Sequence, residues 1–348
     1  MKAAIFHEPN KMSYESIQPP VIQDDEVLLR VAISSVCGTD VRIFEGRKTK
    51  GVRTNSILGH EIVGTIEQTG SNVSDFKKGD RVGVIPVIPC NKCTYCLNGR
   101  ENACINRTAI GYEYDGGFAE FIRIPSRALK SGNLVKLPSS ISFRQAVVAE
   151  PLACCINGSR KTGVKMNDLV VVIGAGPIGL MHVQLAKIAG AKRIIVSEIV
   201  ESRRMKATEV GADIVVDPTL ESLYDRVMTE SDGEGADCAI LAIGVPSLIN
   251  ETLRVLRKGG VINLFAGFNQ NTSCAIDPNL IHYNELRVVG TSASTRADYL
   301  NAIKLIESGR VNTDLLTTPG YTLADLNQAI LDVKCGKAMK PLIEMAMD

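Results

Sequence analysis

The sequence lacks several features that would place it in other classes of protein. No apolar run approaches the ~18 residues of a membrane-spanning helix without a Gly or Pro interrupting it. The net charge is only +1, from 39 Lys and Arg against 38 Asp and Glu, which gives no electrostatic basis for binding nucleic acid. Internal repeats and low-complexity segments are missing, and the opening MKAAIFHEPNK does not have the pattern of a secretory signal. We therefore expect a cytoplasmic protein, and its 348 residues suit two domains.

Four of the ten cysteines lie in one short segment with the spacing C-x2-C-x2-C-x7-C. They are Cys90, Cys93, Cys96 and Cys104. The residues between them are too polar for a buried core, and disulfides are not expected in a cytoplasmic chain. Thiolates on short loops can surround one cation without closing a large ring. The spacing therefore predicts a closed, structural zinc site.

A second group of possible ligands is spread more widely. Cys37 lies in VCGTD, and His60 and Glu61 are adjacent in LGHEIVG. Sulfur, nitrogen and oxygen from distant positions suit a metal that keeps one coordination position open for chemistry. The alternative is that no metal binds here, and that Cys37 is a buried thiol while His60 and Glu61 form an ordinary hydrogen-bonded pair. The residues alone leave both interpretations open.

The middle of the chain has the pattern of a dinucleotide-binding fold. The apolar, β-branched run 168–173 predicts a buried parallel strand, and a helical pattern follows that ends at Gly190. A second strand over 193–197 finishes at an acidic residue. Glycines at the turn let the backbone approach a pyrophosphate at a helix N-terminus, and the acid accepts hydrogen bonds from a ribose. The predicted cofactor-binding residues here are Gly174, Gly176, Pro177, Ile178, Gly179 and Glu198.

The same region bears on the choice between NAD and NADP. A carboxylate at Glu198 repels the 2′-phosphate of NADP and accepts the free hydroxyls of NAD. The nearby Arg203, Arg204 and Lys206 favour a phosphate instead, unless they form a solvated face of the next helix. We expect NAD, with Arg203 among the residues that contact the cofactor.

Taken together, these motifs resemble those of the zinc-containing medium-chain alcohol dehydrogenases, in the polyol branch typified by sorbitol dehydrogenase and L-threonine dehydrogenase. The resemblance runs almost end to end: C-G-T-D at 37–40, G-H-E at 59–61, G-D-R-V at 79–82, D-G-G-F-A-E at 115–120, E-P at 150–151 and G-A-G-P-I-G at 174–179. It implies an α/β protein with a GroES-like, mostly β catalytic domain over 1–153 and 291–348. A Rossmann, doubly wound NAD-binding domain would occupy 154–290, and the protein would be a homodimer or homotetramer.

The resemblance also implies roles for individual residues. It assigns a catalytic zinc to Cys37 and His60, with Glu61 and Glu150 as competing or combining carboxylate ligands, and a second zinc to the four-cysteine segment. Glu150 has an alternative role as a salt-bridge partner at the domain boundary. The catalytic residues implied are Thr39, Glu61 and Glu150, and the further cofactor contacts are Phe265, Ala266, Gly267, Thr291 and Ser292.

Thr39 would take the proton of the alcohol through its hydroxyl. Many relatives end this proton relay at a histidine three residues further on, where this sequence has Arg42. Arginine cannot act as a base near neutral pH, so the route by which the proton leaves is open.

The resemblance implies oxidation of a secondary hydroxyl of a sugar alcohol to a ketose, with hydride passing to NAD. The segment 291–294 lacks the arginine that sorbitol dehydrogenases use to hold polyol hydroxyls, so L-threonine 3-dehydrogenase or another secondary alcohol dehydrogenase is the alternative. The loop 46–53 carries four cations and no acid: Arg47, Lys48, Lys50 and Arg53. It is either a solvated loop or subunit contact, or a phosphate-binding loop that would make the substrate a polyol phosphate.

Three other classes compete with this interpretation. A zinc-stabilised NAD-binding regulator and a zinc-independent reductase could each dispense with Cys37, His60 and Glu61, which are all present. A zinc-ribbon nucleic-acid module would need a basic surface around its cysteines, and Lys92 and Arg100 do not supply one.

Overall fold

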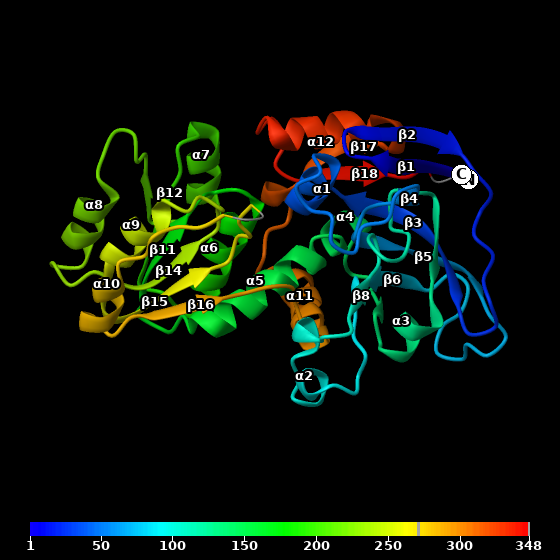
Figure 1. Cartoon of the computed structure of the whole chain (residues 1–348), viewed down its shortest axis with the longest axis horizontal. Coiled ribbons are helices and arrows are strands. Elements are labelled where there is room, and N and C mark those ends of the chain that lie inside the picture. The colour runs from blue at the N-terminus through cyan, green and yellow to red at the C-terminus, as the bar shows by residue number, and fades with distance from the viewer. Residues whose placement is uncertain (270–271, 347–348) are drawn as a thin grey trace. The chain divides into compact units, whose positions relative to one another are not determined.

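The computed structural model describes residues 1–269 and 272–346, which form two compact units. The first unit comprises Met1–Ala153, Ser294–Ser308 and Thr317–Asp348, and the second comprises Cys154–Ala293 and Gly309–Leu316. The division falls inside one helix, α5 (Ala149–Thr162) (Figure 1). Within the described residues, no helix is both long and apolar enough to cross a membrane.

The first unit is mostly β, as the GroES-like prediction requires. Its largest sheet has seven strands in the order β10-β6-β5-β3-β18-β17, with β9 paired to β3, and smaller sheets are β2-β1-β4 and β7-β8. The strands are β1 (Lys2–Glu8), β2 (Lys11–Ser16), β3 (Val27–Ser35), β4 (Ser56–Ile57), β5 (Glu61–Thr69), β6 (Arg81–Val84), β7 (Val87–Ile88), β8 (Thr108–Ala109), β9 (Phe121–Ile124), β10 (Leu134–Lys136), β17 (Thr318–Thr322) and β18 (Pro341–Glu344). The helices are α1 (Gly38–Phe44), α2 (Thr94–Leu97), α3 (Ser126–Lys130), α4 (Phe143–Ala146), α11 (Arg296–Glu307) and α12 (Leu326–Lys334).

Strand β3 is the centre of this unit and determines where the functional residues meet. Eight of its nine residues are buried, all except Arg30, because β5, β9 and β18 all pair with it. Antiparallel pairing with β5 sets Ser35 opposite Glu61, and pairing with β18 sets Ser35 opposite Leu342. The end of β3 therefore lies beside the start of β5 and the start of β18, although these segments are far apart in sequence.

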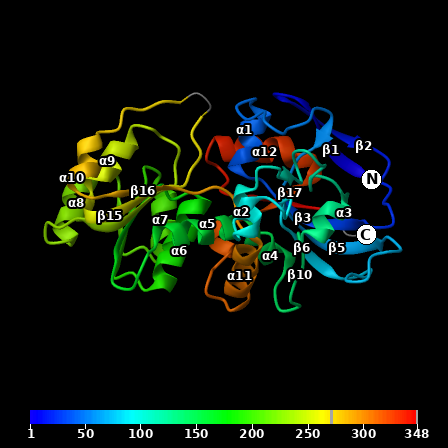
Figure 2. The ribbon, with the colours of Figure 1, turned by 60° about the horizontal axis from the view of Figure 1, so that its bottom comes forward.

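The second unit is the predicted doubly wound fold. Its six strands are all parallel, in the order β13-β12-β11-β14-β15-β16. They are β11 (Leu169–Ile173), β12 (Arg193–Ser197), β13 (Ile214–Val216), β14 (Ala236–Leu241), β15 (Leu256–Leu264) and β16 (Arg287–Gly290). Figure 2 shows β16, the strand at one edge, beside β15. The connecting helices are α6 (Pro177–Ala189), α7 (Glu201–Glu209), α8 (Leu223–Glu230), α9 (Leu248–Arg254) and α10 (Pro278–Tyr283).

The local predictions in the second half of the chain agree closely with these bounds. Gly190 ends α6 in the left-handed conformation, with φ of 87°. Helix α11 begins at Arg296 because Thr295 caps it: Asp298 N–H donates to the Thr295 hydroxyl, and the Asp298 carboxylate accepts from Thr295 N–H at 2.9 Å. Residues 309–316 belong with the second unit, where Asn312 and Gln184 of α6 exchange two hydrogen bonds, of 2.7 and 3.3 Å.

Candidate active site

Three predicted metal ligands come together at the end of β3. Cys37 is the residue before α1, His60 precedes β5, and Glu61 is the first residue of β5. One ligand atom from each of the three lies within 4.8 Å of the other two. His60 and Glu61 are buried and Cys37 is half-buried. This is a compact group of sulfur, nitrogen and oxygen donors with one partly open side, the kind of set that suits a catalytic metal.

Glu61 is held by two groups that are not among the predicted residues. Its Oε2 accepts hydrogen bonds from the Ser35 hydroxyl and from the ammonium group of Lys340, 2.5 Å away. Its Oε1 is buried and has no hydrogen-bond partner among the described residues. Burial lowers the pKa of Lys340, but Glu61 and Cys37 outweigh it and raise the net pKa. A buried acceptor left unpaired is costly, and a cation bound by Cys37 and His60 would satisfy it. The residues therefore fit a metal.

His60 is oriented from its Nδ1 side. Asp40 Oδ1 and the Tyr112 hydroxyl each lie 3.3 Å from this nitrogen. Asp40 is fully buried, and its other oxygen accepts the backbone N–H of Cys37 at 2.8 Å. Burial lowers the pKa of His60, but Tyr112, Asp40 and Cys37 together raise it well above its usual range. A metal ion would replace the proton that this environment favours, and partners on Nδ1 leave Nε2 as the ligand atom.

The remaining predicted catalytic residues lie nearby but outside the ligand group. Thr39 is in α1, and its hydroxyl accepts a hydrogen bond from Arg42 at 3.1 Å. Glu150 is buried in the first turn of α5. It is not one of the three clustered ligands, although its charge contributes to raising the pKa of Lys340 and of Tyr112. Of the two competing carboxylates, Glu61 is thus the one placed with Cys37 and His60.

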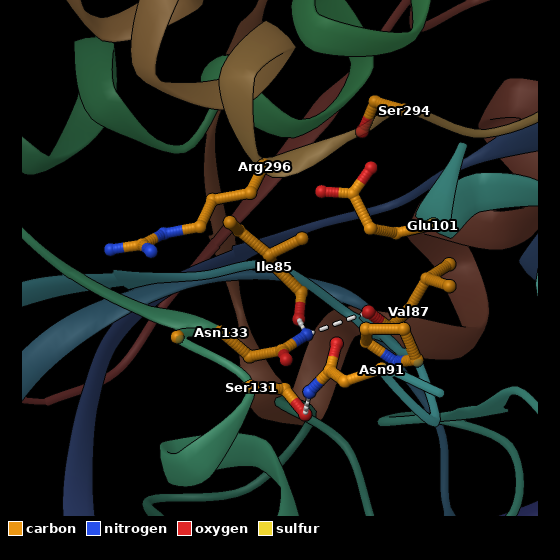
Figure 3. A pocket seen from close by; sticks show the side chains of 10 residues that line it. Ile85, Val87, Asn91, Glu101, Ser131, Asn133, Ser294 and Arg296 are labelled. Atoms are coloured by element: carbon orange, nitrogen blue, oxygen red, sulfur yellow. Dashed lines mark hydrogen bonds between the residues drawn. The ribbon is translucent and has the colours of Figure 1, made fainter. Parts of the chain in front are cut away.

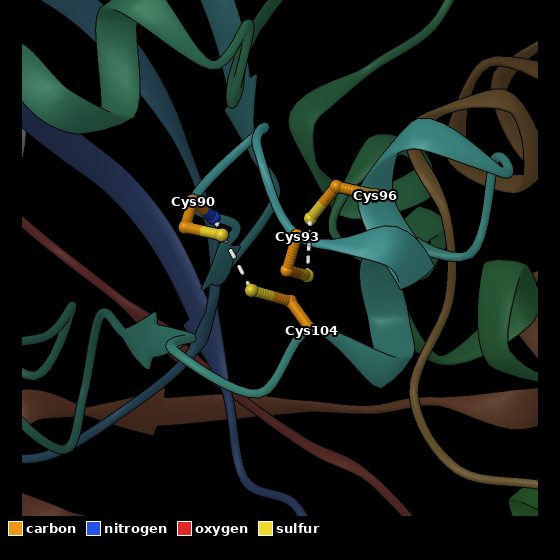
Figure 4. A group of neighbouring side chains, drawn as sticks. All are labelled: Cys90, Cys93, Cys96 and Cys104. Atoms are coloured by element: carbon orange, nitrogen blue, oxygen red, sulfur yellow. Dashed lines mark hydrogen bonds between the residues drawn. The ribbon is translucent and has the colours of Figure 1, made fainter.

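The four clustered cysteines also converge. Their sulfur atoms lie within 4.8 Å of one another, and the four side chains point toward a common centre (Figure 4). All four are free thiols, with Sγ of Cys93 and Cys96 3.5 Å apart, too far for a disulfide. The fit to a tetrahedral zinc site is good in donor type and number.

Backbone amides already prepare two of these thiols to bind a cation. The N–H of Lys92 lowers the pKa of Cys90 to about 6, and the N–H of Cys96 lowers the pKa of Cys93. Burial, together with the neighbouring thiols, raises the pKa of Cys96 to about 12. Four thiols this close cannot all ionise without a positive charge among them, so the arrangement calls for a metal.

A small cavity lies beside the cysteine segment, within the first unit (Figure 3). Its volume is about 40 Å³, room for a few water molecules and too little for a sugar alcohol. Glu101 and Asn133 line it, and each has a buried oxygen without a partner among the described residues. The cavity is large enough for water molecules that would pair with both oxygens.

The glycine turn of the second unit has the geometry of a phosphate-binding loop. Gly174 has a φ of 94°, which other residues rarely adopt, and a Cβ on Gly179 would lie 1.8 Å from the Gly174 carbonyl oxygen. The start of α6 can therefore pack this closely on β11 only with glycine. Glu198 accepts the backbone N–H groups of Ala175 at 2.8 Å and of Val200 at 3.0 Å. The acid thus fastens the glycine turn to the end of β12.

The two arginines after Glu198 are in different situations. Arg204 is engaged by Asp217 at 2.9 Å and donates to the carbonyl oxygens of Glu198 and Ile199. Arg203 has no side-chain partner of this kind among the described residues, and it is half-buried. Of these two arginines, Arg203 is the one whose guanidinium group has no ion-pair partner among the described residues.

The other predicted cofactor residues follow the carboxyl ends of parallel strands, where this fold binds dinucleotides. Phe265, Ala266 and Gly267 come directly after β15, and Thr291 and Ser292 come directly after β16. The Phe265 ring packs edge-on against His182, with centroids 4.6 Å apart. The Thr291 hydroxyl donates to Asn263 at 3.1 Å.

Comparison with known proteins shows the family of the chain. The family "Alcohol dehydrogenase GroES-like domain" matches residues 23–139, and the family "Zinc-binding dehydrogenase" matches residues 177–308. The chain is 31% identical to D-arabitol-phosphate dehydrogenase of Enterococcus avium, over 96% of this chain and 94% of the relative. It is 32% identical to a sorbitol dehydrogenase of Halalkalibacterium halodurans, over 99% of both chains. The chain belongs to the zinc-containing medium-chain dehydrogenases, in their polyol branch. It is an oxidoreductase.

Other relatives leave the substrate and the nucleotide of this medium-chain dehydrogenase open. An L-threonine 3-dehydrogenase of Pyrococcus furiosus is 32% identical over 90% of both chains. A zinc-binding dehydrogenase of Sinorhizobium meliloti 1021, solved with NADP, has a TM-score of 0.92 at 30% identity and covers 99% of this chain and 98% of its own. An Escherichia coli alcohol dehydrogenase solved with NADH has a TM-score of 0.90 at 27% identity and covers 99% of both. A nicotinamide cofactor is common to both structures.

Sequence reasoning did not find four residues that shape the site of this dehydrogenase: Ser35, Asp40, Tyr112 and Lys340. Asp40 had a signal, since it is the last residue of the C-G-T-D motif. The other three lie in segments without a motif, and only the pairing of strands or the packing of a loop brings them to Glu61 and His60.

Proposed function

We propose that this protein oxidises a secondary hydroxyl of a sugar alcohol to a ketone and transfers the hydride to NAD. The observation that supports it best is the Cys37–His60–Glu61 group, in which one buried carboxylate oxygen has no partner among the described residues. Sorbitol and arabitol-phosphate dehydrogenases that resemble the chain over nearly its full length support the polyol as substrate class.

Cys37, His60 and Glu61 would hold the catalytic zinc, which as a Lewis acid lowers the pKa of a substrate hydroxyl. Lys340 fixes one oxygen of Glu61 so that the other is directed to the metal side, and Asp40 fixes the ring of His60. The four clustered cysteines would hold a second, structural zinc. Glu150 would act as the alternative carboxylate ligand if the metal moves within the site.

Thr39 would take the substrate proton. Its hydroxyl oxygen already accepts a hydrogen bond from Arg42, so it keeps its own O–H free to pass a proton onward. The positive charge of Arg42 also favours the deprotonated form of a nearby substrate oxygen. Because arginine itself cannot accept the proton, the proton has to leave Thr39 by another acceptor.

Glu198 would select NAD, since its carboxylate lies at the end of β12, where the adenosine ribose binds in this fold. Self-association as a homodimer or homotetramer stays a prediction, which light scattering would test.

The decisive test is the initial rate of NAD and NADP reduction with sorbitol, D-arabitol, their phosphate esters, L-threonine and ethanol. We expect one of the polyols or polyol phosphates to have the highest kcat/KM, because a site built to pair hydroxyls leaves polar groups unsatisfied around an apolar substrate. His60→Ala should abolish turnover in a folded protein, and His282→Ala, an exposed histidine, is the control. If ethanol is oxidised faster than every polyol, the substrate class is wrong.

A second candidate, L-threonine 3-dehydrogenase, is supported by the Pyrococcus furiosus relative, which is as similar in identity as the sorbitol dehydrogenase. The same panel separates the two, because a higher kcat/KM for L-threonine than for any polyol would favour the amino-acid substrate.

A further inference from the structure

The cations of the loop 46–53 are not equivalent in the folded protein. Arg47 is paired with Glu45, to which its Nε donates at 2.7 Å. Arg53 is paired with Asp115 at 2.5 Å. Each of these charges therefore already has an anionic partner on the protein.

Lys48 differs from both. Its ammonium group lies 4.2 Å from the centre of the Tyr112 ring and donates to the backbone carbonyl of Lys50 at 3.3 Å. Within the described parts of the chain, no carboxylate lies within ion-pair distance of it. It is half-buried, whereas Lys50 is exposed.

Tyr112 connects this lysine with the metal-binding group. One end of the tyrosine is its hydroxyl, 3.3 Å from Nδ1 of His60, and the two rings have centroids 5.4 Å apart. Lys48 rests on the face of the same ring. An ammonium group without a carboxylate partner is thus separated by a single side chain from the residue that would bind the catalytic metal.

The charged groups around Lys48 are positive on balance, which favours the binding of an anion. Burial lowers its pKa, Glu113 opposes that shift, Arg42 and Arg107 lower the pKa further by repulsion, and Asp40 raises it. Glu113 is occupied in part, since its carboxylate accepts the backbone N–H of Ala109 at 2.8 Å. With three cations (Lys48, Arg42 and Arg107) and two carboxylates (Glu113 and Asp40), the charge around Lys48 is positive on balance and favours an incoming anion.

We infer that Lys48 binds the phosphate of a phosphorylated sugar alcohol whose reacting hydroxyl lies at the Cys37–His60–Glu61 group. This inference rests on the proposed function and narrows its substrate class. A phosphate monoester carries about −1.5 to −2 charges near neutral pH, whereas a carboxylate carries one, so the phosphate suits Lys48 and its two cationic neighbours better. Lysine binds phosphate as a compact point charge and needs no fixed orientation for it.

The test compares free and phosphorylated forms of the same sugar alcohol. KM and kcat are measured for D-arabitol, D-arabitol 1-phosphate and D-arabitol 5-phosphate with the wild type and Lys48→Met. We expect the variant to raise KM for the better phosphate ester about ten- to hundredfold, as for a lost hydrogen bond to a charged group, and KM for free D-arabitol far less. Inorganic phosphate should inhibit the wild type more strongly than the variant.

The matched control is Arg47→Met, which removes one charge from the same loop. Glu45 keeps a partner in this variant, because Lys334 lies 2.9 Å from it. The ratio of KM values for the ester and the free polyol should therefore stay as in the wild type. Equal changes in that ratio for Arg47→Met and Lys48→Met would show that the loop acts only through its total charge and would overturn the inference.

Glu113→Gln provides a test that does not depend on removing Lys48. The amide oxygen can still accept the Ala109 N–H, while the charge opposing an anion disappears, so KM for the ester should fall. If neither Lys48→Met nor Glu113→Gln changes the ester-to-polyol ratio, the inference fails and the proposed function stands. If the wild type oxidises neither D-arabitol nor sorbitol nor their esters, the proposed function itself fails. If Lys48→Met impairs L-threonine and not the ester, the anion is a carboxylate and the phosphate assignment is wrong.

Discussion

Replacing Lys340 by methionine tests how charge is balanced at the candidate metal site. Lys340 is 3% exposed and Glu61 is fully buried, with Lys340 Nζ 2.5 Å from Glu61 Oε2. Methionine has a similar length, fills the same space and carries no charge. In the variant, Glu61 keeps the Ser35 hydroxyl as a hydrogen-bond donor but loses the cation beside it.

The loss of stability caused by Lys340→Met depends on whether another cation is present beside Glu61. Removing one partner of a buried ion pair costs about 3–5 kcal/mol, because the remaining charge stays buried without compensation. We expect this full cost in metal-free protein. A divalent cation at Cys37, His60 and Glu61 would supply the missing charge, so the zinc-loaded variant should lose much less. By thermodynamic linkage, the variant should then bind the catalytic zinc more tightly. Zinc affinity should rise about tenfold for each 1.4 kcal/mol by which the loss of stability in the metal-free protein exceeds the loss in the zinc-loaded protein.

The assay is denaturant unfolding of chelator-treated and zinc-loaded protein, together with zinc affinity from competition with a chelating dye. Lys337→Met, which replaces an exposed lysine three residues away, is the control and should change neither quantity. Equal destabilisation of the two forms, or weaker zinc binding by Lys340→Met, would show that Lys340 and the metal do not share the charge of Glu61. That result would refute the reasoning and remove Glu61 from the proposed ligand set.

Three further predictions concern other parts of the chain. Purified protein should contain about two zinc ions per chain by elemental analysis, and Cys93→Ser should lower this to about one and reduce solubility; one metal in fully folded wild type would contradict the two-site proposal. Wild type should favour NAD over NADP about tenfold in kcat/KM, and Glu198→Ala should reduce this preference. Adding Arg203→Met to Glu198→Ala should restore the preference for NAD, because Arg204 is engaged by Asp217 and cannot replace Arg203 at the 2′-phosphate of NADP. His182 is buried, neither of its ring nitrogens has a partner among the described residues, and burial lowers its pKa from 6.5 to about 3. Since His182 takes up a proton in the unfolded chain but not in the folded one, the free energy of unfolding should fall as the pH drops below about 6.5, by about 2 kcal/mol at pH 5. Chemical denaturation measures this fall, which should be smaller in His182→Leu.

The elements predicted most accurately from sequence are those determined by residues within one short segment of the chain. The strand, glycine turn, helix and strand of 169–197 were predicted nearly to the residue, because a buried parallel strand is a continuous apolar run and Gly190 can end a helix in the left-handed conformation. The four clustered cysteines were grouped correctly for the same reason, since a single short segment carries all of them.

The features that sequence did not reveal depend on contacts between distant segments. Lys340 and Glu61 are 279 positions apart, and they meet because β18 and β5 both pair with β3. The loop 46–53 is a second case in which sequence alone does not show which residues are in contact. Its four cations look alike in sequence, and only the positions of Glu45 and Asp115 distinguish the paired arginines from Lys48.

The central position of β3 explains why one strand end can serve as a reaction site. A buried carboxylate at the start of β5 would be costly by itself, and the β3 pairings supply a hydroxyl from Ser35 on one side and an ammonium from Lys340 on the other. Both groups bind the same oxygen of Glu61, and the second oxygen remains unpaired among the described residues, in the group formed with Cys37 and His60. The sheet thus stabilises a charged ligand and orients it at the same time, and the unpaired oxygen is what the cation would complete.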